Sequence, residues 1–190
     1  MIRVMILAMD EKRGIGSSSS LSGLPWHIPA ETAYFKKMTQ GNGVKGKFAV
    51  VMGRTTYARI LSLREKRAVD DIAACRPLVM PGRDVYLLSA DDDDCPGHNT
   101  VHSLKEITGY DALFICGGKQ AYLTSLAAGL VDFALVSYVK GVYDSDVFMP
   151  VFEDKMPLLK TVPFDGFTVR AYRANDGADD TLFSEMLSFL

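Results

Sequence analysis

The sequence predicts an α/β fold with a mostly parallel central sheet, flanking helices and an antiparallel C-terminal hairpin. Several short apolar runs show no alternation with polar residues, which is typical of strands buried on both faces of a parallel sheet. Stretches with helical spacing lie between these runs. A chain of 190 residues suits one domain, spanning 1–190, with a longer segment at about 61–80.

The predicted elements follow in chain order. The expected core strands are Arg3–Met9, Phe48–Met52, Val85–Ser89, Ala112–Cys116 and Phe133–Val139. The expected helices are Ala30–Met38, Thr55–Leu63 with a Thr cap, the short Ser103–Ile107, and Lys119–Ala128. Phe167–Arg173 and Thr181–Phe189 flank a polar loop and are expected to form the terminal hairpin. Ser17–Ser20 and Asp91–Asp94 are expected to be solvated loops.

Composition narrows the possible partners and the compartment. The 21 basic and 23 acidic residues nearly balance, so nothing predicts a nucleic-acid or membrane-surface partner. No apolar run is long enough to span a bilayer, and the N-terminus lacks a signal-peptide pattern. Cys75, Cys95 and Cys116 show no CxxC spacing, which predicts neither a disulfide framework nor a metal site. A cytoplasmic protein is therefore expected.

The segment that contains the single tryptophan carries the most chemical information. Pro25 and Pro29 stiffen the chain around Trp26, and Glu31 falls in the first turn of the helix that follows. Phe35, four residues on, shares the helix face of Glu31. A carboxylate beside an aromatic ring on such a face indicates a binding pocket. The alternative is a first-turn acid that merely complements the helix dipole.

Two strand-to-helix joints indicate a phosphate-bearing ligand. Gly53 and Arg54 lead from a strand into a helix, and Gly117 and Gly118 do the same at a second joint. Helix N-termini present free N–H groups, and glycines let a ligand approach the backbone. Taken by itself, the first joint could be a plain capped helix, and the second could be a tight turn. Neither joint carries the GxGxxG fingerprint.

Taken together and in order, these segments resemble the dihydrofolate reductase family over nearly the whole chain. The matching segments are Ala8-Met9-Asp10 with Gly14-Ile15-Gly16, LPWHIPAETAYFK, VVMGRTTY, PGRDVYLLS, ICGGKQAY and DVFMP. A dihydrofolate-reductase-like fold is the fold that this resemblance implies.

The resemblance implies a substrate site and a cofactor site. Glu31 and Trp26 would be catalytic, with Glu31 holding the pterin ring and Trp26 an ordered water. The implied substrate-binding residues are Ile6, Glu31, Thr32, Phe35, Ile60, Arg83, Cys116, Tyr122 and Ser137. The implied NADPH-binding residues are Ile15, Gly16, Leu24, Gly53, Arg54, Thr55, Thr56, Leu88, Ser89, Gly117, Gly118, Lys119, Gln120 and Tyr122. The Gly14–Leu24 loop would close over the nicotinamide, held by Asp146, and the Gly117–Gly118 bond would be cis.

Four features depart from the family pattern. Thr32 stands where an apolar residue is usual, and Lys119 replaces a third glycine. Leu61–Cys75 is longer than usual and is expected to be an extended helix or a surface insertion. Ser17–Ser20 lengthens the mobile loop.

The implied activity is NADPH-dependent reduction of 7,8-dihydrofolate, by hydride transfer to pterin C6 and protonation of N5 by water. Burial would raise the pKa of Glu31 and a cationic pterin would lower it, and the sequence leaves the outcome open. The alternatives are a riboflavin-pathway pyrimidine reductase, which lacks the Trp26 and Glu31 run, and a non-catalytic homologue. A monomer that acts on a small-molecule substrate is expected.

Overall fold

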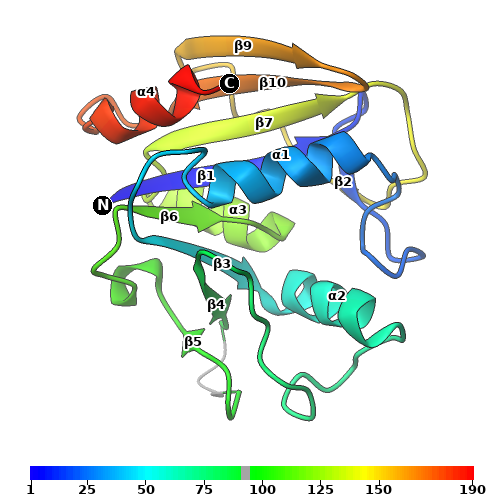
Figure 1. The fold of residues 1–190 in the computed structure, drawn as a ribbon. Helices are drawn as coiled ribbons and strands as arrows, with labels where there is room; N and C mark the ends of the chain where they lie inside the picture. The colour runs from blue at the N-terminus through cyan, green and yellow to red at the C-terminus, as the bar shows by residue number, and fades with distance from the viewer. Residues whose placement is uncertain (91–94) are drawn as a thin grey trace.

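An eight-stranded sheet organises the computed structural model, which describes residues 1–90 and 95–190 (Figure 1). The strand order is β5-β4-β3-β6-β1-β7-β10-β9, and a separate two-stranded sheet pairs β2 with β8. The strands are β1 (Ile2–Met9), β2 (Gly14–Gly16), β3 (Phe48–Gly53), β4 (Asp84–Leu88), β5 (Thr100–Val101), β6 (Ala112–Ile115), β7 (Phe133–Val139), β8 (Val147–Phe148), β9 (Leu158–Phe164) and β10 (Phe167–Arg173). The expected loop Asp91–Asp94 lies outside the described residues.

The apolar runs form the parallel centre of the sheet, as predicted. β1 lies between β6 and β7 and pairs in parallel with both, so that Val4 is opposite Phe114 on one side and Phe133 on the other. All three side chains are fully buried. Continuous apolar sequence is the pattern of such strands because helices cover both faces of the sheet.

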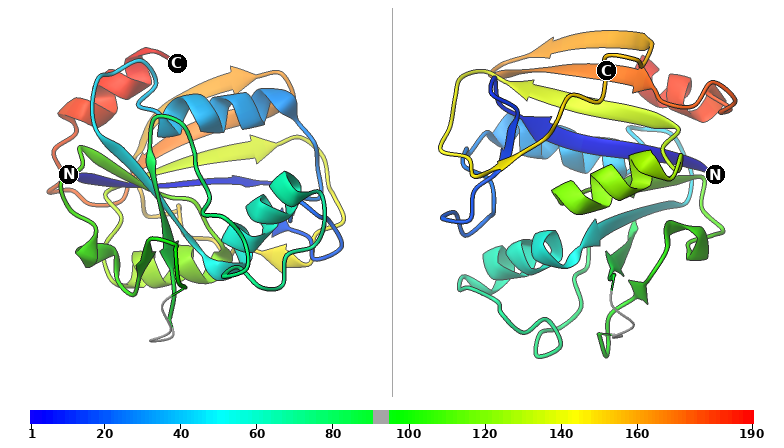
Figure 2. Two further views of the ribbon diagram at one scale, coloured as in Figure 1. Left: turned by 60° about the horizontal axis from the view of Figure 1, so that its bottom comes forward. Right: turned by 180° about the vertical axis from the view of Figure 1, so that it is seen from behind.

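Helices form a layer on each face. α1 (Pro29–Thr39), α2 (Arg54–Glu65) and α4 (Thr181–Ser188) pack on one face, where Tyr34, Leu61 and Met186 share a core with Val50. α3 (Lys119–Ala127) and the short η1 (Leu104–Glu106) pack on the other face. Figure 2 shows α3 alone over the sheet centre when the molecule is seen from behind. The predicted α/β fold class is therefore confirmed.

The predicted partner strand of the C-terminal hairpin is wrong. β10 pairs antiparallel with the preceding β9, and Thr181–Phe189 forms α4 instead of a strand. Phe183, Met186 and Leu187 are buried at the i, i+3, i+4 spacing of a helix face. Phe183 stacks on Phe133 with the ring centroids 4.1 Å apart. This packing outweighs the strand propensity of the segment.

Helix α2 begins and ends differently from the expected Thr55–Leu63. Gly53 is its N-cap residue and makes no side-chain cap hydrogen bond, so Thr55 lies inside the helix and does not cap it. The helix extends to Glu65 and stops at Lys66, whose φ of 55° is left-handed.

The longer segment is mostly a surface insertion that follows α2. Residues 66–79 contain no helix or strand, yet Val69, Ile72 and Leu78 are buried. The backbone N–H of Leu78 donates to the Tyr57 hydroxyl of α2 at 2.8 Å. The insertion is therefore anchored to α2.

Candidate active site

Glu31 is a buried carboxylate. It follows Pro29 in the first turn of α1, and it is only 8% exposed. Burial raises the pKa of Glu31, while Ser137 on β7 acts in the opposite direction. The Ser137 hydroxyl is itself buried and lies outside strict hydrogen-bond geometry with any described residue. An acid that only complemented a helix dipole would gain nothing from burial, so Glu31 has the character of a ligand-binding group.

Trp26 presents a buried donor without an acceptor. Its ring packs edge-on against Tyr143, with centroids 5.4 Å apart, and the side chain is 7% exposed. The indole Nε1 has no hydrogen-bond partner among the described residues. Buried donors are normally satisfied, so this N–H suits a water or a ligand.

The substrate residues predicted on the strands come together around Tyr122. The Tyr122 hydroxyl donates to the carbonyl oxygen of Ile6 at 2.8 Å. Burial raises the pKa of Tyr122, and the nearby Cys116 and Glu31 raise it further. Burial likewise raises the pKa of the Cys116 thiol. The middle of β1, the end of β6 and the first turns of α1 and α3 thus surround one region.

Apolar side chains from both helices border this region. Phe35 of α1, Ile60 of α2 and Leu24 of the loop are partly buried and pack against the same core cluster. The Arg83 guanidinium is half-buried, donates to the carbonyl oxygen of Lys36 at 3.2 Å, and pairs with no carboxylate among the described residues. Burial lowers the pKa of Arg83. Such a cation is suited to a carboxylate ligand.

The two glycine joints contact each other. The Gly53 N–H donates to the Gly117 carbonyl oxygen at 2.7 Å, and the Gly117–Gly118 peptide bond is cis. A Cβ added to Gly118 would lie 3.2 Å from Thr56 Oγ1. The N-termini of α2 and α3 therefore meet at a bare stretch of backbone with a hydroxyl beside it. A dinucleotide pyrophosphate fits such a surface.

Further residues predicted for the cofactor extend this surface toward β4. Arg54 Nε donates to the Ser89 hydroxyl at 3.3 Å, and Leu88 ends β4 just before Ser89. His102 Nδ1 lies 3.3 Å from the Ser89 carbonyl oxygen. A fixed positive charge and a hydroxyl thus lie side by side, as a phosphate requires.

The loop after β1 is held at its base and near its tip. Asp10 accepts from the Gly14 N–H at 2.8 Å and from the Tyr143 N–H at 3.0 Å. β2, which contains Ile15 and Gly16, pairs with β8. Near the tip, Asp146 accepts hydrogen bonds from the backbone and hydroxyl of Ser18.

Some predicted residues lie on the surface. Thr32 is exposed, and its hydroxyl is 3.5 Å from the Ile28 carbonyl oxygen. Thr55, Lys119 and Gln120 are also exposed at the starts of α2 and α3. The expected solvated character of Ser17–Ser20 is wrong for Ser17, which is 6% exposed. Its N–H donates to the carbonyl oxygen of Gly23, which lies on the returning side of the same loop.

Sequence reasoning missed three residues that position the loop: Asp10, Arg59 and Tyr143. Asp10 lies in a matching segment, but no role was expected for it. Arg59 donates from α2 to carbonyl oxygens of the loop. A hydrogen bond to a backbone carbonyl leaves no residue-type signal at its acceptor, so no pattern in the sequence indicated this contact.

A cavity of about 620 Å³ lies between α2 and the insertion. Its lining includes Arg54, Arg59, Val69 and Cys95 and does not include Glu31. The cavity is therefore next to the Arg54 side of the site. Among the described residues, no helix is long and apolar enough to cross a membrane, and no His, Cys, Asp and Glu group could hold a metal ion.

The fold and this geometry define a class, an α/β protein in which two strand-to-helix joints meet at one sheet edge and a buried carboxylate, Glu31, lies near Tyr122 of α3. The family model described as dihydrofolate reductase matches residues 2–160. The Mycoplasma genitalium dihydrofolate reductase is 31% identical over 172 residues, covering 90% of this chain and 96% of that protein. The Bacillus subtilis dihydrofolate reductase is 35% identical over 122 residues, covering 62% of this chain and 58% of that protein.

A solved structure shares the fold. The Enterococcus faecalis dihydrofolate reductase complexed with NADP(H) and RAB-propyl aligns with a TM-score of 0.68 and 24% identity, covering 92% of this chain and 97% of that chain. The chain belongs to the dihydrofolate reductase family. It is an NADPH-dependent oxidoreductase of this type, as the sequence motifs predicted.

Proposed function

We propose that this chain reduces 7,8-dihydrofolate to 5,6,7,8-tetrahydrofolate at the region bounded by Glu31, Trp26, Phe35 and Ile60. The observation that carries the proposal is the buried Glu31 carboxylate, whose neighbours are Ser137 of β7 and Tyr122 of α3 rather than solvent. A carboxylate can accept two hydrogen bonds from a ring N–H and an exocyclic amino group. In a site with little water such bonds fix the plane of the pterin ring.

The substrate tail would lie between α1 and α2. Phe35 and Ile60 offer apolar contacts from the two helices, and Thr32 makes the α1 side more polar. Arg83 would pair with the glutamate carboxylate of the tail, for which its partly desolvated guanidinium is suited, since its Nε has no partner among the described residues.

The cofactor would lie along the glycine joints. Gly117, Gly118 and Thr56 would hold its pyrophosphate, and Arg54 with Ser89 would hold the 2′-phosphate. When bound there, NADPH supplies the hydride, and the protein supplies position and electrostatics. Ile15, Gly16 and Leu24 would border the nicotinamide from the loop side.

The protein's own groups would orient the substrate and its proton donor. The hydroxyls near Glu31 belong to Ser137 and Tyr122, and the Tyr122 hydroxyl donates to the Ile6 carbonyl oxygen, so we assign Glu31 to holding and polarising the ring. Trp26 Nε1 would hold the water that delivers the proton to N5. Burial raises the pKa of Glu31, so the carboxyl binds a proton more readily than it would in water.

The test replaces the carboxylate by its neutral isostere. Glu31→Gln is expected to lower the turnover number at about pH 7 by roughly 100-fold or more, with the NADPH dissociation constant within about two-fold of wild type. Glu31→Asp should keep most of the activity, because it retains the carboxylate. Glu185→Gln, an exposed acid on α4, is the matched control. Full activity in the Gln variant would contradict the proposal.

We further propose that the protein works in the cytoplasm as a monomer, on a small molecule, without a nucleic-acid or membrane partner. The near balance of 21 basic and 23 acidic residues supports the absence of a nucleic-acid or membrane-surface partner. The riboflavin-pathway alternative is not favoured, because Trp26 and Glu31 are both present and buried. An assay of NADPH oxidation with dihydrofolate also tests the non-catalytic alternative.

A further inference from the structure

Arg59 of α2 reaches across to the loop between β2 and α1. Its Nη1 donates to the Ser20 carbonyl oxygen and its Nη2 to the Ser18 carbonyl oxygen, each at 3.1 Å. The stem of Arg59 lies against Gly23, where an added Cβ would be 3.1 Å from Arg59 Cγ. Figure 1 shows this loop descending beside α2, and both views in Figure 2 place the two together.

The same stretch of loop is held from its other side by Asp146. The Ser18 N–H donates to Asp146 Oδ1 at 3.0 Å and to Oδ2 at 2.9 Å. These bonds hold the pKa of Asp146 low, and the positive charge of Arg59 contributes to the lowering. Ser18 is therefore fixed at its N–H by one charged side chain and at its C=O by another.

The serine tract shapes the loop for this contact. The Ser17 and Ser19 hydroxyls lie 2.8 Å apart, and those of Ser20 and Ser22 lie 2.9 Å apart. The Gly23 N–H donates to the Ser20 carbonyl oxygen at 3.0 Å. This turn presents two carbonyls within reach of one guanidinium. A planar guanidinium can bind both at once, whereas an ammonium group is a single point of charge.

We propose that Arg59 is a positioning residue that ties the loop of residues 14–24 to α2 and holds it closed during the reaction. This inference rests on the proposed function. Arg59 and Ile60 are neighbours on α2, and Leu24 follows the held part of the loop. Closing such a loop excludes water and fixes the distance between the reacting atoms.

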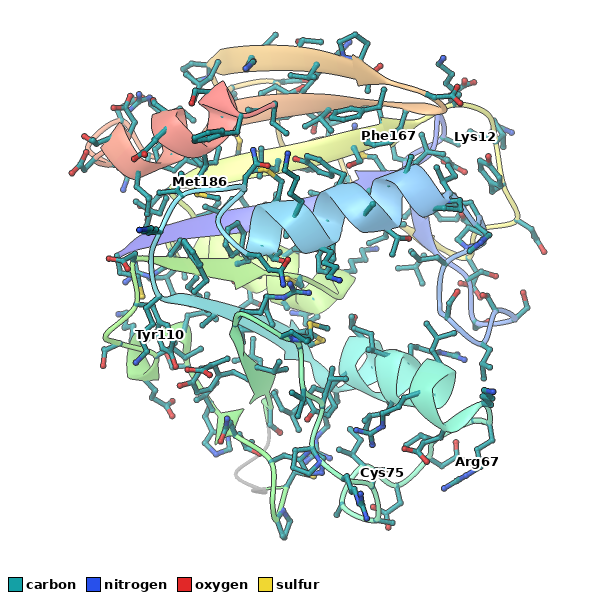
Figure 3. The ribbon with its side chains drawn as sticks, in the orientation of Figure 1. Lys12, Arg67, Cys75, Tyr110, Phe167 and Met186 are labelled. Carbon is teal, nitrogen blue, oxygen red and sulfur yellow. The ribbon has the colours of Figure 1, made fainter. Side chains whose placement is uncertain are left out.

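The first experiment measures amide hydrogen exchange of residues 17–23 in the full protein without ligand. Arg59→Ala is expected to speed exchange in this loop by about ten-fold or more, and Arg59→Lys to give an intermediate rate. Arg67→Ala is the matched control, because Arg67 is exposed in the insertion and its side chain donates to the carbonyl oxygen of its neighbour Ala68 and not to the loop (labelled in Figure 3). Unchanged exchange in Arg59→Ala, or faster exchange spread over the whole chain, would overturn the inference.

The second experiment measures the single-turnover rate with NADPH and dihydrofolate. Arg59→Ala should slow this rate by about ten-fold, with the KM for dihydrofolate within about two-fold and the Tm unchanged. Adding Asp146→Asn should slow it by less than the product of the two single effects, because both residues hold Ser18. A wild-type single-turnover rate in Arg59→Ala would overturn the inference. Absence of turnover in the wild type would instead contradict the proposed function, and the exchange measurement would still decide the role of Arg59.

Discussion

The backbone N–H of Gly53 donates a hydrogen bond of 2.7 Å to the carbonyl oxygen of Gly117. This bond joins two strand-to-helix turns that are far apart in the sequence. β3 and β6 are parallel neighbours, so their carboxyl ends share one edge of the sheet and their following helices start side by side. Two positive helix ends at one place favour a ligand with more than one phosphate.

Gly118→Ala tests whether this backbone must stay bare. Its φ is -81°, so alanine brings no backbone strain, but the added Cβ would lie 3.2 Å from Thr56 Oγ1. The methyl would fill the surface proposed for the pyrophosphate, and NADPH affinity is expected to fall about ten-fold, by isothermal calorimetry. Gly177→Ala, where the nearest atom is 3.6 Å from the added Cβ, is the control. Unchanged affinity in Gly118→Ala would place the pyrophosphate elsewhere.

Arg54→Ala tests the site of the 2′-phosphate. Arg54 lies at the start of α2 and donates to Ser89, and a charge-assisted contact to a phosphate would be lost on substitution. The preference for NADPH over NADH, measured as the ratio of kcat/KM values, should fall by about ten-fold to 100-fold. Arg67→Ala should keep the wild-type ratio. An unchanged ratio in Arg54→Ala would assign the phosphate to another group.

The sheet and its ligand edge could be predicted because both depend on local sequence patterns. The run that contains Val50 has no polar alternation, is rich in β-formers and ends at Gly53, which together favour a strand covered on both faces. The glycine joints follow from the same rule, since parallel strands end at one edge. The hydrogen bond between Gly53 and Gly117 could not be predicted in this way, because no pattern in the sequence gives the distance between the two joints.

The C-terminal elements could not be predicted, for a different reason. Thr181–Phe189 is short and apolar, and such a segment is ambiguous between strand and helix until its packing is known. Contact between Phe183 and Phe133 decides it. β9 was missed because it is an edge strand with Pro163 and with Leu158 exposed, so no buried run marked it.

The hold of Arg59 on Ser18 and Ser20 belongs to the same group of unpredicted features. The sequence shows an arginine on a helix and a run of serines, and both patterns are typical of solvated surface. The contact depends on how far the loop descends toward α2, which only the three-dimensional arrangement determines.

Burial of Glu31 predicts an inverted effect of pH on stability. The pKa of Glu31 is raised above its ordinary value of 4.5, so the folded state binds this proton more tightly than the unfolded state does. The contribution of this proton to the free energy of unfolding is complete below the ordinary pKa, and it is lost as pH rises through the raised pKa. Above that pH the folded protein carries a buried charge.

Glu31→Gln, which stays neutral, should therefore be more stable than wild type at about pH 8 by roughly 1 kcal/mol, and equal to it below about pH 4. Urea denaturation at both pH values measures the difference. Glu185→Gln should show no such pH dependence. If the Gln variant were less stable than wild type at every pH, the carboxylate would be a structural partner and not a group kept for a ligand.

Glu153 and Arg13 form a charged pair at the base of the loop of residues 14–24. Arg13 Nη1 and Nη2 donate to the two Glu153 carboxylate oxygens at 2.7 and 2.9 Å. Burial pushes the pKa of Glu153 upward, but the Arg13 bonds together with backbone N–H groups outweigh it and hold this pKa at about 2. Arg13 also donates to the Met149 carbonyl oxygen, so the pair connects the turn after β1 to the segment after β8.

Glu153→Gln is expected to lower the free energy of unfolding at about pH 7 by roughly 2 kcal/mol, because a bidentate, partly buried pair is lost. A lowered pKa stabilises the fold above the ordinary value of 4.5, and this stability is lost as pH falls toward about 2. The difference between variant and wild type should therefore be constant above about pH 5.5 and shrink below 4.5, measured by urea denaturation across this range. Glu65→Gln is the matched control, since its pair with Arg64 is more exposed and should contribute less than about 0.5 kcal/mol. Equal effects of the two substitutions would mean that burial and bidentate geometry add nothing at Glu153, and the base of the loop would then depend on its backbone hydrogen bonds alone.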